Sequence, residues 1–279
     1  MMMLQTHLLL LTALLQPALS QGFAGDWDAA YTKATASLSK LTLSEKVGIV
    51  SGVGWGKGAC SGNTSPVKSI GYPALCLQDG PLGVRSAASI TAFPAGILAG
   101  ATWDRRLMKE RGRGIGEEVR DLGIHVILGP VAGPLGQFVQ GGRNWEGFSN
   151  DPYLSGVATA WTIDGIQSAG AQACVKHYIL NEQEKNRETM NSVIDDRTLH
   201  EMYLWPFVDA VRANVASVMC SYNRIDGKYA CENKKIMEEL LKGELGFKGY
   251  VLTDWNALHS TSDSANAGLD MSMPGRSVS

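Results

Sequence analysis

The sequence predicts an α/β fold of the TIM-type (β/α)8-barrel kind, on two observations. Short apolar runs alternate with longer stretches whose apolar residues recur at helical spacing. This alternation is typical of parallel strands, because parallel neighbours need long crossovers between them. In addition, five of the apolar runs end in polar or charged residues, as strands do at the rim where a barrel gathers its functional residues. We therefore expect a ring of site residues around a barrel mouth.

An open, doubly wound sheet would satisfy the same alternation. Such a sheet binds nucleotides through a glycine-rich phosphate loop that follows an early strand. The candidate loop, Gly112 to Glu118, has its glycines at the wrong spacing and lies inside a charged helical stretch. A nucleotide site is therefore disfavoured, and the barrel is the preferred fold class.

The individual elements follow from apolar periodicity, caps and breakers. Thr42 or Ser44 can cap a helix that starts before Glu45. Pro152 suits the first turn of a helix, whereas Pro206 should kink the helix that contains it. In chain order, we expect a helix over 26–41, a strand over 73–80, a helix over 104–121, a strand over 124–130, a helix over 151–168, a strand over 173–178, a helix over 195–214, a strand over 216–223, a helix over 234–245, and strands over 250–254 and 268–273.

The composition suits one large domain. The chain has 279 residues, of which 44% are hydrophobic, so it can bury one large core. Its formal net charge is −2, which gives no electrostatic reason to expect a nucleic acid or an acidic membrane surface as partner. Neutral, polar small molecules fit this charge better. The oligomeric state stays open.

The first twenty residues have the pattern of a secretory signal peptide. An apolar stretch from Leu8 to Leu15 is followed by Pro17 and by the small residues Ala18 and Ser20. The stretch is shorter than the roughly 20 apolar residues that span a membrane. Because no Lys or Arg precedes it, a buried N-terminal helix is the alternative. We expect cleavage near Ser20 and a secreted, extracellular protein.

The cysteines fit an oxidising compartment. The short separations favour two local disulfides, Cys60 with Cys76 and Cys220 with Cys231. Cys174 is left over, and because it lies in an apolar run we expect a buried free thiol. The spacings match neither a Cys-x-x-Cys element nor a zinc finger.

One acceptor sequence for an N-linked glycan is present, Asn63-Thr64-Ser65. It lies in a stretch rich in Gly and Ser that we expect to be an exposed loop. If the protein is secreted, Asn63 is the expected site of a glycan.

Two of the polar clusters lie in loops that contain glycine. Asp79 ends an apolar run, and Arg85 follows across a Gly-Pro turn. A turn aspartate that caps a local N–H is the simpler interpretation of Asp79. The second loop places Arg143 beside Asn144, Trp145 and Glu146, an unusual grouping for a plain surface loop.

Two more clusters end apolar runs. Lys176 and His177 are adjacent, and since consecutive strand residues point to opposite faces, only one should face the barrel interior unless the strand is already turning into its loop. Met219 and Tyr222 are also candidates, although both could equally belong to the core.

Asp254 is the strongest single candidate. It ends the apolar run that starts at Tyr250, and Trp255 follows it. A helix-capping aspartate next to a packing tryptophan is the alternative. An ionised carboxylate at a barrel strand end, beside an aromatic ring that can pack on a sugar, suits glycoside hydrolysis. That chemistry also needs a second carboxylic acid to protonate the leaving oxygen, and the sequence offers no obvious residue for that role.

Two other enzyme classes are disfavoured. A metal-dependent hydrolase needs several His and carboxylate ligands in one site. After the presumed signal there are His125, His177, His200 and His259, without His-x-His or His-Glu-x-x-His spacing. A serine nucleophile elbow of the Gly-x-Ser-x-Gly type is also missing.

Taken together, six motifs carry a family resemblance. They are QDGPLGVR (78–85), GGRNWEGF (141–148), VKHYILNEQE with NRE after it (175–188), ASVMCSYN (216–223), GFKGYVLTDWNA (246–257) and AGLDMSMPG (267–275). In this order they resemble the N-terminal barrel domain of fungal glycoside hydrolase family 3 β-glucosidases. The resemblance covers about 26–275, and it implies retaining hydrolysis of terminal non-reducing β-D-glucosyl residues of cellobiose and related cello-oligosaccharides or β-glucosides. It implies no metal and no organic cofactor.

The resemblance also implies roles for individual residues. Asp254 would be the nucleophile that forms the glycosyl-enzyme intermediate, and Trp255 would pack against the sugar in the first subsite. Tyr222 could donate a hydrogen bond that tunes the nucleophile, and a bend would let both Lys176 and His177 reach the sugar. The positions that would line the glucose pocket are Asp79, Arg85, Arg143, Lys176, His177, Arg187, Met219 and Tyr222.

The resemblance departs from the family at the C-terminus. In this family the acid/base carboxylate comes from a second α/β domain, whereas this chain ends at Ser279, just past the expected eighth strand. We therefore expect residues 21–279 to form the barrel domain without its final helix and without that second domain. The resulting expectation is a nucleophile that lacks its acid. A non-catalytic, glucose-binding remnant is the alternative.

Overall fold

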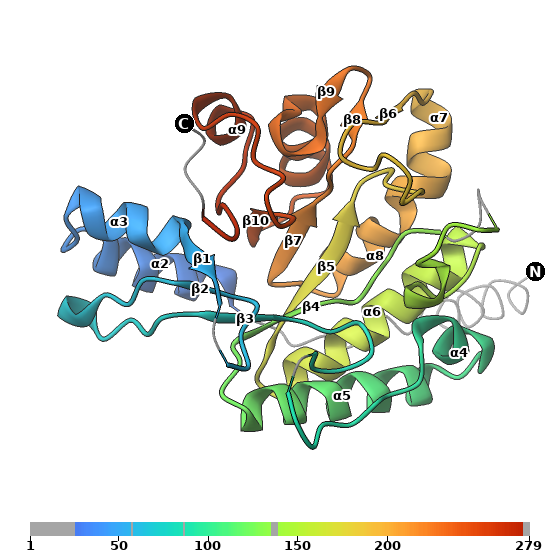
Figure 1. The fold of residues 1–279 in the computed structure, drawn as a ribbon, viewed down its shortest axis with the longest axis horizontal. Coiled ribbons are helices and arrows are strands. Elements are labelled where there is room, and N and C mark those ends of the chain that lie inside the picture. The colour runs from blue at the N-terminus through green and yellow to red at the C-terminus, as the bar shows by residue number, and fades with distance from the viewer. Residues whose placement is uncertain (1–25, 57, 86, 135–138, 276–279) are drawn as a thin grey trace, which may run out of the picture.

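A curled, seven-stranded sheet forms the centre of the computed structural model, which describes residues 26–56, 58–85, 87–134 and 139–275 (Figure 1). The expected signal peptide lies outside these residues. From β3 onward, neighbouring strands are parallel, whereas β1, β2 and β3 are joined antiparallel. The strand order is β1 (Gly52–Trp55), β2 (Gly62–Thr64), β3 (Cys76–Asp79), β4 (Val126–Leu128), β5 (Gln172–Tyr178), β7 (Ser217–Cys220) and β10 (Tyr250–Thr253).

The segment 271–274 joins the two edges of this sheet. The N–H of Met271 donates to the carbonyl of Val251 in β10, at 3.0 Å. One residue on, the N–H of Ser272 donates to Val50, and Gly52 of β1 donates back to Ser272. Backbone hydrogen bonds through this segment therefore bridge the two edges of the curled sheet, which forms an incomplete barrel. The segment makes isolated bridges to Ser51 and Leu252, so the expected strand over 268–273 is present only as this narrow seam.

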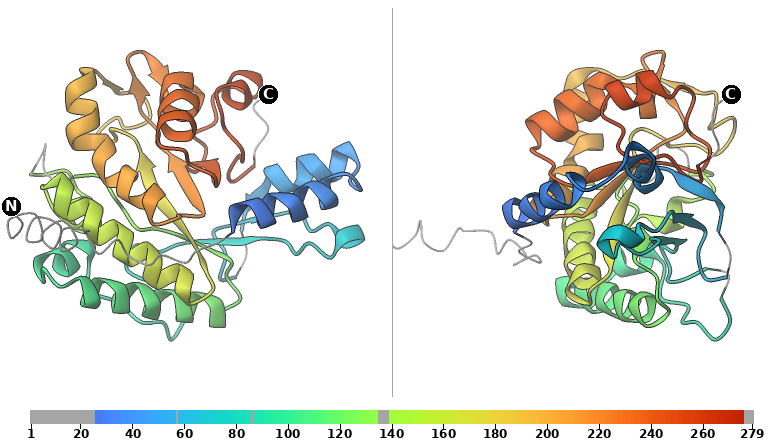
Figure 2. Two further views of the ribbon diagram at one scale, coloured as in Figure 1. Left: turned by 180° about the vertical axis from the view of Figure 1, so that it is seen from behind. Right: turned by 90° about the vertical axis from the view of Figure 1, so that its left-hand side faces the viewer.

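Helices cover the outside of the parallel part of the barrel (Figures 1 and 2). Asp104 accepts hydrogen bonds from the first turn of α5 (Arg105–Asp121), and Asp151 does the same for α6 (Pro152–Ser168), with Pro152 in the first turn as expected. Thr42, not Ser44, caps α3 (Leu43–Val50) in a capping box with Glu45. The remaining helices are α2 (Trp27–Leu38), α4 (Gly96–Ala101), α7 (Asp196–Thr198), α8 (Trp205–Arg212) and α9 (Ser262–Asn266).

The helix expected over 195–214 is present but is not uniform. A π-helical stretch, Leu199–Leu204, precedes α8. Pro206 lacks the N–H that would bond to the carbonyl four residues earlier, so the helix changes its winding just before it. A second π-helical stretch, Lys235–Glu244, stands where a helix over 234–245 is expected.

The glycines of the segment 112–118, which do not form a nucleotide-binding loop, are explained by helix packing. A β-carbon placed on Gly112 in α5 would lie 2.4 Å from the carbonyl oxygen of Thr162 in α6. Likewise, one on Gly165 in α6 would lie 2.2 Å from the carbonyl oxygen of Lys109. These glycines therefore allow α5 and α6 to lie side by side, as Figure 2 shows.

The strands bury side chains on both faces. Leu77, Val126, Cys174 and Leu252 pack together in one cluster of buried side chains. Alternate positions such as Val175 pack in a second cluster that includes helix residues. Continuous apolar runs are typical of strands that are covered on both faces, which explains why these strands were recognisable in the sequence.

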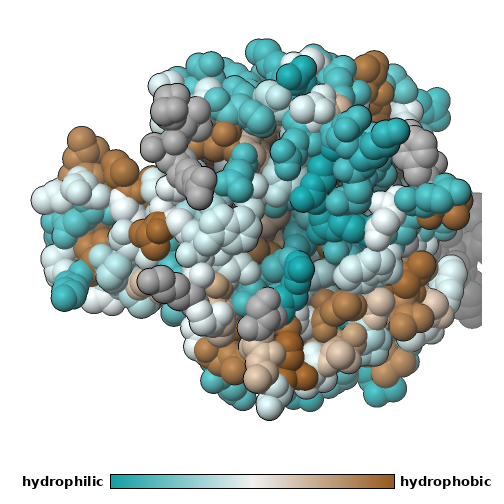
Figure 3. All heavy atoms as spheres, in the orientation of Figure 1, coloured by the Kyte–Doolittle hydropathy of each residue, from teal (hydrophilic) through white to brown (hydrophobic). Residues whose placement is uncertain are grey.

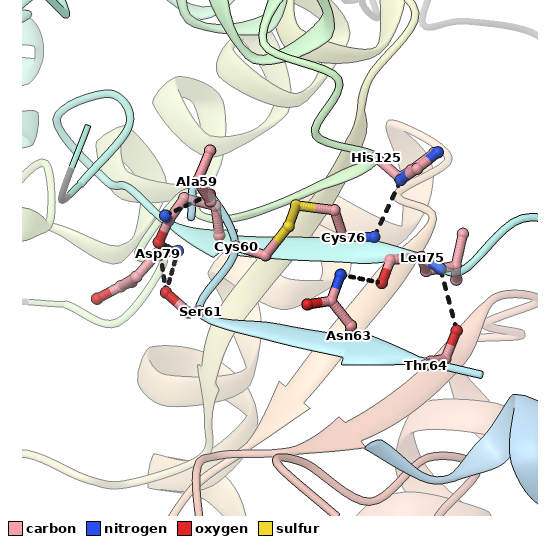
Figure 4. Close-up of a disulfide and its surroundings, with 10 residues drawn as sticks. Ala59, Cys60, Ser61, Asn63, Thr64, Leu75, Cys76, Asp79 and His125 are labelled. Atoms are coloured by element: carbon pink, nitrogen blue, oxygen red, sulfur yellow. Dashed lines mark hydrogen bonds between the residues drawn. A yellow bond between two sulfur atoms is a disulfide. The ribbon is translucent and has the colours of Figure 1, made fainter. Parts of the chain in front are cut away.

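The structure joins Cys60 to Cys76 and Cys220 to Cys231, the two pairs that the separations favour, and Cys174 is a buried free thiol. The second bridge links the end of β7 to a turn beside a small sheet of β6 (Asn191–Ser192), β8 (Arg224–Ile225) and β9 (Lys228–Tyr229). The first bridge fastens the loop after β1 to β3 (Figure 4).

The surroundings of Asn63 differ from the exposed loop that the sequence predicts. Asn63 is not in an exposed loop but in β2, paired with Cys76, and it is half-buried. Its side-chain amide donates to the carbonyl of Leu75 at 3.2 Å, and the hydroxyl of Thr64 accepts from the N–H of Leu75 (Figure 4). Glycine-rich sequence resembles a loop because it lacks side chains that favour strands, yet here it forms the β1–β2 hairpin.

The hairpin region extends to one side of the barrel together with α2 and α3 (Figures 1 and 2). In the part of the chain that the structure describes, neither of these two helices has a buried side chain. Hydrophobic residues show on this projection in Figure 3. Leu43 and Val47 of α3 are exposed. None of the helices in the described ranges is both long and apolar enough to cross a membrane.

Candidate active site

A cavity of about 670 Å³ opens where the parallel strands end. All ten residues that the sequence analysis proposes for the site line it. Because the carboxyl ends of parallel strands meet at one rim, segments that are far apart in the sequence converge here. In the view of Figure 3, hydrophilic residues gather over the end of β5. The proposed residues are Asp79, Arg85, Arg143, Lys176, His177, Arg187, Met219, Tyr222, Asp254 and Trp255.

Asp79, at the end of β3, is held by two cations. Nζ of Lys176 donates to Oδ1 of Asp79, and Nη1 of Arg85 donates to Oδ2. Burial alone would raise the pKa of the Asp79 carboxyl, but Lys176 and then Arg85 outweigh it and hold this pKa well below its usual value. Asp79 is therefore an ionised hydrogen-bond acceptor inside the cavity.

Asp254 follows β10 and is 8% exposed. The N–H of Trp255 donates to its Oδ1 at 2.7 Å. Burial raises the pKa of the Asp254 carboxyl, opposed by the charge of Lys176, the Trp255 N–H, the Tyr222 hydroxyl and the charge of Arg143. A carboxylate this poorly hydrated, surrounded by donors and cations, is placed to react with an electrophilic carbon.

His177 lies between Asp254 and Arg143. Its Nε2 is 3.8 Å from Oδ2 of Asp254 and 3.2 Å from Nη2 of Arg143. Burial, together with the charges of Lys176 and Arg143, lowers the pKa of His177 well below its usual value, so the imidazole is neutral. A guanidinium can only donate. Nε2 of His177 therefore accepts from Arg143, and Nδ1 carries the proton.

Lys176 and His177 both face the cavity although they are adjacent in β5. The pairing of β5 with β7 shifts its register between Val175 and Tyr178. An irregularity of this kind interrupts the strict alternation of side chains. Both residues can therefore line the same cavity.

Tyr222 and Trp255 form one wall of the cavity. The hydroxyl of Tyr222 donates to the carbonyl of Trp255 at 2.9 Å. The guanidinium carbon of Arg187 lies 4.5 Å from the centre of the Tyr222 ring, which is a cation–π contact. Met219 is also part of the wall and packs in the barrel interior with Trp255.

Eight further residues, which the sequence analysis does not propose for the site, also line the cavity, and four of them are polar or aromatic. Trp55 and Ser61 come from the β1–β2 hairpin, for which the glycine-rich sequence predicts a loop. Trp145 and Glu146 lie in the same glycine-flanked loop as Arg143. Glu146 is buried, and both of its oxygens accept from Arg143, at 3.0 and 2.9 Å. A short-range Arg-x-x-Glu pattern in a glycine-flanked loop is the signal that could have found this pair.

The described residues give no support for a metal site. Within the described ranges, His, Cys, Asp and Glu side chains form no group of three or more that could hold a metal ion. Three carboxylates line the cavity, Asp79, Glu146 and Asp254, and the first two are neutralised by cations of the protein itself.

Comparisons with known proteins agree with this geometry. A model of the glycosyl hydrolase family 3 N terminal domain matches residues 62–277. A probable beta-glucosidase L of Aspergillus terreus is 65% identical over 268 residues, which is 96% of this chain but 36% of that protein. The chain thus spans about a third of the length of the curated relatives it matches.

Two solved structures have the same fold. The beta-D-glucoside glucohydrolase of Trichoderma reesei superposes with a TM-score of 0.88 at 65% identity, covering 91% of this chain and 36% of that one. Beta-glucosidase 3B of Thermotoga neapolitana, solved in complex with glucose, gives a TM-score of 0.82 at 38% identity, covering 88% of this chain and 37% of that one.

Proposed function

The chain belongs to glycosyl hydrolase family 3, and from that membership we propose that it is the barrel part, residues 21–279, of a retaining β-glucosidase. The proposed substrates are terminal, non-reducing β-D-glucosyl residues of cello-oligosaccharides and other small β-glucosides. The observation that carries the proposal is Asp254: a buried carboxylate at a barrel strand end, inside a cavity lined with hydrogen-bonding groups and aromatic rings.

In the proposed reaction, a carboxylate oxygen of Asp254 forms a bond to the anomeric carbon of glucose. The bond from that carbon to the leaving oxygen breaks, and its electron pair goes to the leaving oxygen. Water then hydrolyses the glycosyl ester. Asp79 would accept hydrogen bonds from sugar hydroxyls, and Lys176 and Arg143 would donate them. Trp255 would pack against the sugar ring.

When the leaving group is a sugar or another alcohol, its oxygen must be protonated as the bond to the anomeric carbon breaks, because an alkoxide is a poor leaving group. Neither of the other cavity carboxylates in the described ranges is suited to donate one, because Asp79 is ionised between Lys176 and Arg85 and Glu146 is bound by Arg143. We therefore propose that the acid is a carboxyl group outside the described residues. General acid help is typically worth about 10² to 10⁴ in rate.

A non-catalytic, glucose-binding protein is the second candidate. The specific observation in its favour is the same shortage of an acid among the described cavity residues. The complex of the Thermotoga neapolitana relative with glucose is compatible with both candidates.

We also propose that the protein acts outside the cell. The two disulfides support this, since stable disulfides are typical of secreted proteins. No nucleic acid or membrane is proposed as a partner.

Covalent trapping separates the two candidates. The chain is incubated with 2,4-dinitrophenyl 2-deoxy-2-fluoro-β-D-glucoside, whose leaving group needs no proton. The hydrolase proposal expects one fluoroglucosyl group per chain by intact-mass spectrometry, located on Asp254 by peptide mapping and missing in Asp254→Asn. Glucose binding by calorimetry without any adduct would overturn the hydrolase proposal in favour of the second candidate.

A further inference from the structure

Glu184 lies between two of the cavity arginines. Its Oε2 is 3.0 Å from Nη1 of Arg187, and its Oε1 is 3.7 Å from Nη1 of Arg143. Arg143 comes from the loop between β4 and α6, whereas Glu184 and Arg187 come from the loop after β5. One carboxylate therefore connects two loops that follow the neighbouring strands β4 and β5.

The two loops approach each other closely at this point. A β-carbon placed on Gly142 would lie 3.5 Å from Cγ of Glu184, and Gly142 has a φ of +81°. This conformation is one that glycine adopts at little cost. Gly142 thus lets the first loop pack directly on the Glu184 side chain.

The two arginines depend on Glu184 to different extents. Arg143 is bound through two hydrogen bonds by Glu146, so it keeps a carboxylate partner without Glu184. Arg187, by contrast, has Glu184 as its carboxylate partner in the described part of the chain, and its other contact is the ring of Tyr222 at 4.5 Å. The position of Arg187 over Tyr222 therefore depends mainly on Glu184.

Tyr222 interacts with Trp255 and with Asp254, the proposed nucleophile. Its hydroxyl donates to the carbonyl of Trp255 and also lowers the pKa of the Asp254 carboxyl. A chain of contacts thus runs from Glu184 through Arg187 and Tyr222 to the residues at the reacting end of the cavity.

We propose that Glu184 is a positioning residue of the sugar site. It fixes Arg187 on the face of Tyr222, supports Arg143 from the second loop, and so sets the geometry around Asp254 without contacting the sugar itself. The inference rests on the proposed function, which it deepens by assigning a role to a residue that the pocket does not include.

The test is a double-mutant cycle in the full chain with Glu184→Gln and Arg187→Met, read both as the rate of labelling by the dinitrophenyl fluoroglucoside and as the dissociation constant of glucose. Glu184→Gln should lower the labelling rate by about tenfold or more, because small displacements of site groups have effects of this size. In the Arg187→Met background the same substitution should change the rate by less than about threefold, since its target is already missing.

Glu201→Gln is the matched control. It removes an exposed Glu–Arg ion pair of the same 3.0 Å length, with Arg197, away from the cavity. It should label at the wild-type rate. Circular dichroism and urea unfolding establish that each variant is folded.

The outcomes separate this inference from the proposed function. If the wild type labels and Glu184→Gln labels equally fast, or if the two substitutions act independently, the positioning role is wrong while the hydrolase proposal stands. If the wild type binds glucose without labelling, the hydrolase proposal fails, and the double-mutant cycle is then read from the dissociation constants of glucose. Non-additive effects of Glu184→Gln and Arg187→Met on these constants support the positioning role of Glu184, and additive effects overturn it. A wild type that neither labels nor binds glucose overturns both.

Discussion

The imidazole of His177 lies 3.8 Å from the carboxylate of Asp254 and yet is neutral. Burial and the nearby charges of Lys176 and Arg143 outweigh the opposing charge of Asp79 and lower the pKa of His177 well below its usual value. The neutral ring can then accept from Arg143. Asp254 is therefore surrounded by neutral and fixed cationic donors instead of a titrating partner.

The first prediction concerns pH and folding stability. The pKa of His177 is lower in the folded protein than the value of about 6.5 in an unfolded chain. Between these two values the unfolded state binds more protons, so the stability falls as the pH falls below about 6.5. His177→Gln should remove this contribution, which reaches at most about 2 kcal/mol between pH 6.5 and pH 5. Urea unfolding of both proteins at several pH values measures it, and parallel pH profiles would contradict it.

The second prediction concerns the ion pair of Lys176 and Asp79, whose side chains are 3% and 21% exposed. Lys176→Met should lower the free energy of unfolding by about 2 to 4 kcal/mol, because it leaves a largely buried carboxylate without its buried cation partner. Adding Asp79→Asn should restore part of the loss, since the uncompensated charge is then removed. Chemical denaturation of the three variants tests this, and a double variant less stable than Lys176→Met would speak against it.

The strands of the parallel part of the barrel could be predicted because they are buried on both faces and so appear as continuous apolar runs. The β1–β2 hairpin could not, because its residues include Gly52, Gly54 and Gly62, and glycine gives no strand signal. The seam at Met271 to Pro274 is stabilised by backbone bonds to two different strands, which depend on tertiary structure and not on local propensity.

The candidate site could be predicted where one residue ends an apolar run, as Asp79 and Asp254 do. Two residues that long-range folding positions are not predicted: Trp55 lines the cavity through the hairpin, and Glu184 lies beside the cavity through the contact between two loops. Lys176 and His177 both line the cavity because the pairing of β5 with β7 shifts its register. The local sequence pattern does not predict this shift.

The third prediction concerns Asn63. Since the Asn63 amide already donates to Leu75 within the β2–β3 pairing, we expect no glycan on it in the folded protein. Ser65→Ala destroys the acceptor sequence without touching that bond, so its electrophoretic mobility should equal that of the wild type, before and after glycosidase treatment. Asn63→Ala should in addition cost about 1 kcal/mol of stability for the lost hydrogen bond. Faster migration of the Ser65→Ala protein would show that a glycan is present.

The fourth prediction is that Asp254→Asn stabilises the fold while abolishing the labelling. Burial raises the pKa of the Asp254 carboxyl above its unfolded value, so the unfolded state releases this proton more readily. The ionised Asp254 therefore costs stability at every pH above about 4, the unfolded value.

Asparagine has the same shape, and its Oδ1 can still accept from the N–H of Trp255. The cations that would lose a neighbour keep partners of their own, Lys176 with Asp79 and Arg143 with Glu146. We therefore expect a gain of about 1 kcal/mol at pH 7, as is common when a functional residue that destabilises the fold is replaced. The gain should shrink as the pH is lowered toward 4, because the wild-type carboxyl is then protonated as well. Urea unfolding at pH 7 and pH 4 measures both values, and an Asp254→Asn protein that is less stable than the wild type at pH 7 would show that the charge of Asp254 stabilises the barrel.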